Sequence, residues 1–231
     1  MVYDIETNDK KMLFENARVG DLTVNSKTHD LWGVEHDRGT ATLIVSPFPY
    51  REIIRLVALS KGEELFDLSI DDAGESIAAV LKKPNGQQSI IIFNGNDLIA
   101  GSSLAYSTIS DNGSPENPSW SESGKYLYWN AFTNGVSNIY RFDFQNSSTK
   151  ALTHCITGIF KPLEVSPDSI FAFEFSSDGF SPVLIKNEPA PFLPAINYLG
   201  QRVIEKEPKL YKWALQNDST EITPMDFTSE E

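Results

Sequence analysis

Residues 118–154 read PSWSESGKYLYWNAFTNGVSNIYRFDFQNSSTKALTH, and this stretch decides the fold. Its two apolar runs, at 125–130 and 138–144, are rich in the aromatic residues that strands prefer. A short polar segment containing Gly135 separates the two runs. Two strand-like runs joined by such a turn predict a β-hairpin.

The same glycine turn occurs four times along the chain. It contains Gly39, Gly86, Gly135 and Gly179, at intervals of 47, 49 and 44 residues. A strand-like run precedes and follows each turn, and a repeat of this length and composition is typical of β-propeller blades. We therefore predict an all-β fold, a β-propeller made of four-stranded antiparallel blades, with about four blades plus a partial one.

The predicted propeller repeats cover residues 1–199, and residues 200–231 form a C-terminal segment with an acidic tail. Alternation and turn residues place the four blades at 17–59, 65–109, 117–154 and 160–199, with INYLG at 196–200 as a possible last strand.

The N-terminus begins in the middle of a repeat unit. Residues 2–14 match residues 138–152, so we predict that they are the outer strands of a preceding blade. Two interpretations follow: the sequence is a piece of a larger propeller, or residues 201–207 and 209–215 close the ring. We favour the first interpretation.

Composition limits the partners and the compartment. The net charge is −13, and no basic stripe offsets it, so we expect neither nucleic-acid binding nor attraction to an anionic membrane. We interpret this charge first as a source of solubility, and the alternative is an acidic face for a basic partner. A single cysteine, Cys155, excludes an intrachain disulfide. No apolar run is long enough to insert into a bilayer, and the N-terminus has no signal-peptide core.

Catalytic and metal-binding patterns are absent from the sequence. GESIA, GVSNI and GFSPV each lack the final glycine of a serine-hydrolase elbow. The three histidines have no metal-ligand spacing. The run 67–74 carries alternate carboxylates, as calcium loops do, but Asp72 stands where the turn glycine is required, so we interpret the run as a blade turn. We expect no enzyme activity, no metal and no cofactor.

The third blade resembles the repeat of TolB-like and WD-repeat-like propellers, and also the propeller repeats of prolyl-oligopeptidase-like peptidases. That repeat reads, in outline, Pro-x-Trp-Ser-Pro-Asp-Gly, a strand, a glycine turn, Ile-Tyr-x-x-Asp and Leu-Thr. The matching residues here are Pro118, Trp120, Ser121, Gly124, Leu127, Tyr128, Gly135, Ile139, Tyr140, Asp143, Leu152 and Thr153. Glu122 and Ser123 replace the usual Pro-Asp, and the first blade, with TVNSKTHD, is the most degenerate.

The resemblance covers residues 2–187 and implies a non-catalytic module that binds a protein partner in the bacterial cell envelope. We therefore expect a periplasmic or exported protein that acts as a scaffold. One alternative is the accessory propeller of a peptidase whose catalytic domain lies outside this chain. The other is a polysaccharide-active propeller enzyme. A small-molecule ligand remains undefined at this stage.

Four side chains are candidate contacts for a partner: Arg18, His36, Arg38 and Lys161. His36 and Arg38 lie with Asp37 in a predicted hairpin turn. Arg18 and Lys161 lie at what the sequence suggests are equivalent positions, at the entrance of an inner strand. Inner strands of a propeller line its channel, so these two cations are candidates for binding an anionic group there.

Overall fold

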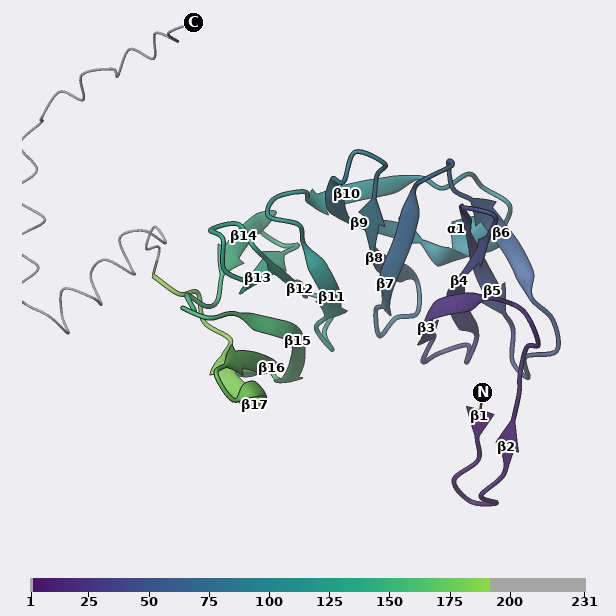
Figure 1. The fold of residues 1–231 in the computed structure, drawn as a ribbon, viewed down its shortest axis with the longest axis horizontal. Coiled ribbons are helices and arrows are strands. Elements are labelled where there is room, and N and C mark those ends of the chain that lie inside the picture. Colours follow the sequence, from purple (N-terminus) through teal and green to yellow (C-terminus); the bar gives the residue numbers. More distant parts are fainter. Residues whose placement is uncertain (1, 192–231) are drawn as a thin grey trace, which may run out of the picture. The chain divides into compact units, whose positions relative to one another are not determined.

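The computed structural model describes residues 2–191, and these form a short hairpin followed by four successive antiparallel sheets (Figure 1). The hairpin consists of β1 (Val2–Tyr3) and β2 (Lys10–Lys11). Each later sheet is a meander, in which every strand pairs with the next along the chain. Innermost strands of successive sheets contact one another, β3 with β7, β7 with β11 and β11 with β15, as expected for propeller blades.

The first blade contains β3 (Val19–Val24), β4 (Leu31–Asp37), β5 (Thr40–Ser46) and β6 (Ile54–Ala58). The second contains β7 (Glu64–Ile70), β8 (Ser76–Lys82), β9 (Gln88–Asn94) and β10 (Tyr106–Ser110). The third contains β11 (Glu116–Trp120), β12 (Tyr126–Ala131), β13 (Asn138–Asp143) and β14 (Ser148–Ala151). The fourth contains β15 (Ile159–Ser166), β16 (Ser169–Ser176) and β17 (Gly179–Lys186).

The predicted glycine turns are confirmed in all four blades. Gly39, Gly86, Gly135 and Gly179 have φ between 79° and 102°, and each connects the second strand of its blade to the third. Side chains other than hydrogen rarely adopt this left-handed conformation, so the repeat depends on glycine here.

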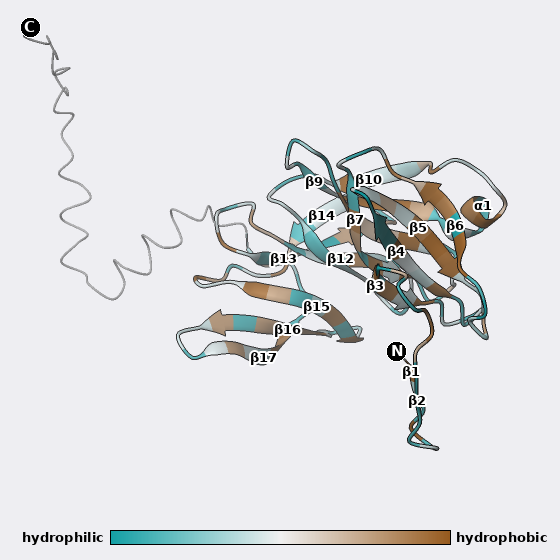
Figure 2. Cartoon of the chain, turned by 45° about the vertical axis from the view of Figure 1, so that its right-hand side comes forward, coloured by the Kyte–Doolittle hydropathy of each residue, from teal (hydrophilic) through white to brown (hydrophobic). Residues whose placement is uncertain are grey.

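Hydrophobic layers between neighbouring blades form the core. Ile77, Ala79 and Leu81 of β8 pack toward the first blade, whereas Ala78 and Val80 of the same strand pack toward the third. Because alternate residues of a strand point to opposite faces, one strand contributes to two layers. Figure 2 shows apolar residues concentrated along the strands.

The large side chains of the third blade show the same alternation. Leu127 and Trp129 of β12 are buried against the second blade, and Tyr128 is buried against the fourth. These side chains stabilise the packing of blades.

Two details differ from the predicted strand layout. A short helix, α1 (Gly95–Ile99), follows β9, and the Asn94 side chain caps it by accepting hydrogen bonds from the backbone of Asn96 and Asp97. After β17 the chain passes back to the third blade, where the Ala190 N–H donates to the Ala151 carbonyl at 2.8 Å. The suggested strand at 196–200, the segments at 201–207 and 209–215 and the tail at 200–231 lie outside the described residues.

Candidate functional site

One end of every blade carries both a glycine turn and the start of the innermost strand. In the first blade Val19 of β3 lies beside Glu35 of β4, and in the third Glu116 of β11 lies beside Asn130 of β12. The second and fourth blades pair in the same way. We call this end the turn face, defined by the four glycine turns and the first residues of β3, β7, β11 and β15.

A β-bulge interrupts each innermost strand at the same place near the turn face. The register shifts once in β3, β7 and β11 and at two places in β15. At each corresponding bulge one residue has a left-handed backbone, with φ of 47° to 54°. We call these four residues the ladder: Asp21, Asp67, Asn117 and Lys161. Asp and Asn tolerate this conformation better than most side chains, but lysine does not share that tolerance.

The ladder corrects one prediction from the sequence. Lys161 is equivalent to Asp21 and not to Arg18, because Asp21 and Lys161 occupy corresponding bulges whereas Arg18 precedes β3. The first blade is the most degenerate repeat, and its register is set by the bulge, which the local sequence does not reveal.

Hydrogen bonds connect the ladder from blade to blade. The Asp67 N–H donates to Asp21 Oδ1 at 3.4 Å, and the Asn117 N–H donates to Asp67 Oδ2 at 2.9 Å. The pattern changes at the fourth blade, where the Lys161 N–H donates to Asn130 Oδ1 at 3.2 Å. Asn117 Nδ2 donates to the same oxygen at 3.0 Å. The bulges leave the backbone N–H groups of Asp67, Asn117 and Lys161 without a partner strand, and these bonds satisfy them.

The ladder places carboxyl groups close together in a partly buried setting. Burial raises the pKa of Asp67, and the nearby Asp21 raises it further, whereas the Asn117 N–H and Lys161 lower it. Burial also raises the pKa of Glu116, with a further contribution from Asp67. Desolvation and like charge both disfavour the ionised carboxylate.

The other predicted contacts gather at the turn face of the first blade. Arg18 and Arg38 each lie near Asp37, with N–O distances of 3.8 and 4.0 Å. The His36 N–H donates to the Arg18 carbonyl at 3.1 Å, and its side chain is exposed. Ion pairs this exposed contribute little to stability, so these side chains are available to a partner. Lys161 lies apart from them, on the fourth blade.

Four phenylalanines form an exposed group on the turn face of the third and fourth blades, which we call the phenylalanine patch: Phe132, Phe160, Phe175 and Phe180. Phe160 lies 6.1 Å from Phe132 and 5.5 Å from Phe180, and Phe180 lies 5.2 Å from Phe175, measured between ring centroids. The exposed fractions of Phe132, Phe175 and Phe180 are 41%, 44% and 62%. These rings leave a substantial apolar surface in contact with water.

Backbone contacts hold the patch in place. The Phe132 N–H donates to the Gly113 carbonyl at 2.6 Å, and the Phe175 N–H donates to the Gly158 carbonyl at 2.9 Å. A side chain at position 158 would press on the Phe160 ring, within 3.0 Å of its edge. The sequence does not reveal this patch because its rings come from the loop after β12, the start of β15, the end of β16 and the start of β17.

A groove of about 360 Å³ adjoins the ladder. Its polar lining residues are Asp67, Asn117, Ser119 and Lys161. Its apolar side is formed by Leu68, Pro118, Pro162, Leu163, Phe171 and Phe173. The groove therefore combines a polar rim with an apolar floor, the composition of ligand-binding sites.

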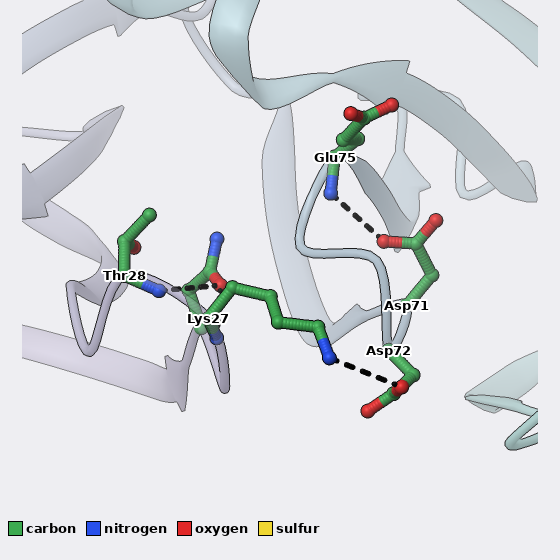
Figure 3. Close-up of polar contacts among 6 residues, drawn as sticks. Lys27, Thr28, Asp71, Asp72 and Glu75 are labelled. Carbon is green, nitrogen blue, oxygen red and sulfur yellow. Dashed lines mark hydrogen bonds and ion pairs between the residues drawn. The ribbon is translucent and has the colours of Figure 1, made fainter.

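The opposite end of the blades carries the run that resembles a calcium loop. Asp71 Oδ1 accepts hydrogen bonds from the backbone of Glu75 and Ser76. Asp72 pairs with Lys27 of the first blade at 3.4 Å, and Figure 3 shows this pair together with the contact between Glu75 and Asp71. These contacts confirm the interpretation of the run as a blade turn. Within residues 2–191, no group of three His, Cys, Asp or Glu side chains is arranged to hold a metal ion.

One hydrogen-bonded pair has the composition of an activated nucleophile but not its properties. The Tyr128 hydroxyl donates to Glu164 Oε1 at 3.0 Å and accepts from Asn187 Nδ2 at 2.8 Å. Tyr128 is fully buried, and burial raises the pKa of its hydroxyl, with Glu164 adding to the shift. A nucleophile must be accessible to its substrate and have a lowered pKa, and Tyr128 meets neither condition. Its hydrogen bonds instead connect the third and fourth blades.

Ser137, in GVSNI, is also engaged in packing between blades. It is buried, and its hydroxyl donates to the Ile159 carbonyl at 2.8 Å. This contact agrees with the structural interpretation of the sequence around Gly135.

No family model and no curated protein matches the chain. Among solved structures, TolB from Acinetobacter baumannii is similar with a TM-score of 0.64 at 15% sequence identity, over 82% of this chain and 48% of its own. The tricorn protease matches 94% of this chain and 20% of its own, with a TM-score of 0.53 at 14% identity. A puromycin-hydrolyzing peptidase from Mycobacterium tuberculosis matches 76% of this chain and 32% of its own, with a TM-score of 0.53 at 16% identity.

The chain spans about half the length of the TolB structure that it matches. In the part of the chain that the structure describes, no helix has the length and apolar character that crossing a membrane requires. At these identities the comparisons concern the fold, and at that level they confirm the predicted resemblance to the TolB-like repeat and to the propeller repeats of peptidases.

Proposed function

We propose that this chain is a non-catalytic, TolB-like propeller module that binds a protein partner through its turn face. The phenylalanine patch is the observation that carries the proposal. Trp32, Tyr128 and Trp129 pack between blades, whereas Phe132, Phe175 and Phe180 are exposed and join Phe160 in one continuous set of ring contacts. Aromatic residues that remain exposed and rigidly held are typical anchors of protein interfaces.

The neighbourhood of the patch supports a protein partner. The patch adjoins Lys161 in sequence and lies on the same face as the exposed groups around Asp37. A face that carries both exposed aromatic rings and charged groups has the mixed composition of a protein interface.

The test compares two phenylalanines of nearly equal exposure at opposite ends of the blades. Phe180 is 62% exposed on the turn face, and Phe48 is 64% exposed on the loop after β5. The purified chain, Phe180→Ser and Phe48→Ser are each immobilised and exposed to an extract of the producing cells. We expect Phe180→Ser to weaken retention of specific proteins at least tenfold, as removal of an interface anchor does, and Phe48→Ser to retain them. Equal retention by both variants would sink the proposal.

Enzymatic alternatives make a different prediction. A polysaccharide-active propeller would turn over a sugar polymer, and a peptidase-associated propeller would change peptide turnover by a catalytic domain. We propose that the chain does neither. A panel of polysaccharide substrates, incubated with the purified chain with and without added divalent metal, is expected to show no turnover; metal-dependent turnover would favour the polysaccharide-active enzyme.

We further propose that the protein acts in the cell envelope of a bacterium, which the likeness to TolB supports. The protein is expected in the periplasmic fraction after spheroplast release, detected with an antibody raised against this chain. Recovery with cytoplasmic marker proteins would contradict this placement.

A further inference from the structure

The Lys161 side chain differs from those of the other ladder residues in its hydrogen bonding. The carboxylates of Asp21 and Asp67 accept backbone bonds from the next blade, and the Asn117 amide donates to Asn130. A lysine ammonium only donates and therefore cannot continue the ladder. Within residues 2–191 the Lys161 ammonium forms no hydrogen bond or ion pair with another side chain, and it is exposed at the groove.

The groove beside Lys161 offers an apolar floor with few hydrogen-bond donors. The residue after each of the last two ladder positions is a proline, Pro118 and Pro162, and neither has a backbone N–H. Leu163 is 52% exposed there, and the Phe171 and Phe173 rings meet edge to face at 5.2 Å. This floor suits an apolar side chain.

The charges at the groove determine which polar group of a ligand would bind there. Asp67, at the other side of the groove, already accepts the Asn117 N–H through Oδ2, and its ionisation is disfavoured by burial. Lys161 is the cation among the residues that line the groove, and it forms no ion pair within residues 2–191, so its ammonium is available to a ligand. A carboxylate is the complementary group, and it would point toward Lys161 and away from Asp67.

We infer that the groove binds the C-terminal residue of a partner polypeptide, with its apolar side chain on Phe171 and Leu163 and its free carboxylate paired with Lys161. Capture of a chain terminus is a known mode of peptide recognition. The groove volume of about 360 Å³ is near the lower end of ligand sites, which fits one or two residues rather than a long segment. The inference rests on the proposed function and specifies its partner.

The test uses the full 231-residue chain and short peptides that differ at one group. Acetyl-Gly-Leu and acetyl-Gly-Phe are titrated as free acids and as C-terminal amides, and binding is measured by NMR chemical-shift changes. We expect the acids to bind at least tenfold more tightly than the amides. Lys161→Met should remove that difference, whereas Lys186→Met, an exposed lysine of β17, should preserve it.

Acetate is titrated in parallel to distinguish binding of a polypeptide C-terminus from binding of any small carboxylate anion. If acetate binds as tightly as the peptide acids, the groove recognises a free anion and the inference is wrong. It is equally overturned if acids and amides bind alike, if Lys161→Met has no effect, or if no peptide binds at 10 mM. None of these peptide results bears on the phenylalanine patch. If protein retention depends on Phe180, the proposed function stands whatever the peptides do. If retention does not depend on Phe180, the proposed function and this inference both fail.

Discussion

Asn187 connects the third and fourth blades, and its replacement by alanine gives a sharp test of how the blades are held together. The side chain is buried, and Nδ2 donates to the Tyr128 hydroxyl at 2.8 Å and to the Pro167 carbonyl at 2.9 Å. Its Oδ1 accepts from Arg141 at 2.7 Å. Asn187→Ala removes all three bonds at once.

The expected cost follows from those three bonds. A hydrogen bond contributes about 1 kcal/mol net, and one to a charged donor about 1.5–3 kcal/mol. Two partners keep a second contact, because the Tyr128 hydroxyl still reaches Glu164 and Arg141 still reaches the Asn187 carbonyl at 3.0 Å. We therefore expect a loss of about 3 kcal/mol in the free energy of unfolding, somewhat below the simple sum of the three bonds.

The assay is thermal and urea unfolding of the wild-type chain, Asn187→Ala and a control, Asn112→Ala. Asn112 is exposed on the loop before β11. For a chain of this size, about 3 kcal/mol corresponds to a fall in Tm of roughly 6–12 °C. The control should stay within about 0.5 kcal/mol of wild type, as surface substitutions do. A Tm for Asn187→Ala that equals that of the control would refute the assigned role of Asn187.

Three further predictions concern the core, the ladder and one tight turn. Trp129→Ala, at a side chain that is 1% exposed between the second and third blades, should cost about 3–5 kcal/mol in urea unfolding, and a loss below about 1 kcal/mol would contradict the packing described. Burial raises the pKa of Asp67 in the folded state, so its ionised form destabilises the fold at pH 7, and this penalty disappears as the pH falls through the folded-state pKa. Asp67→Asn, which keeps an acceptor oxygen, should therefore have the higher Tm at pH 7, and its advantage should shrink by pH 4; a constant difference would count against the assignment. Gly113→Ala should be less stable than Gly135→Ala by about 1–3 kcal/mol in the free energy of unfolding, and should have the lower Tm. Both glycines have positive φ, but only at position 113 does an added Cβ overlap the Thr133 backbone, so equal Tm values would disprove this.

Much of the fold could be predicted from local signals. The four glycine turns and the alternating apolar runs identify the blades, because a hairpin repeat encodes both the turn and the inward faces of its strands. The opposite burial of Tyr128 and Trp129 followed from alternation alone. Helix α1 was not predicted, since five residues have little intrinsic helicity and Leu98 stabilises the helix by packing into the core of the first two blades.

The candidate site was less predictable because it depends on contacts between blades. No single residue type defines the ladder, which contains Asp21, Asp67, Asn117 and Lys161. These residues share a left-handed backbone at a bulge. An apolar or proline residue after each of them was the one available sequence signal. Lys161 was identified as a candidate from its place near a strand entrance, but its correct counterpart became clear only from the register.

The most direct test of the central claim is site-specific photo-crosslinking of the protein in the cells that produce it. A photoreactive p-benzoylphenylalanine replaces Phe180 on the turn face in one variant and Phe48 at the opposite end in the other. Binding through the phenylalanine patch predicts a discrete protein adduct from position 180 and none from position 48. No adduct from position 180, or the same adducts from both positions, would contradict it.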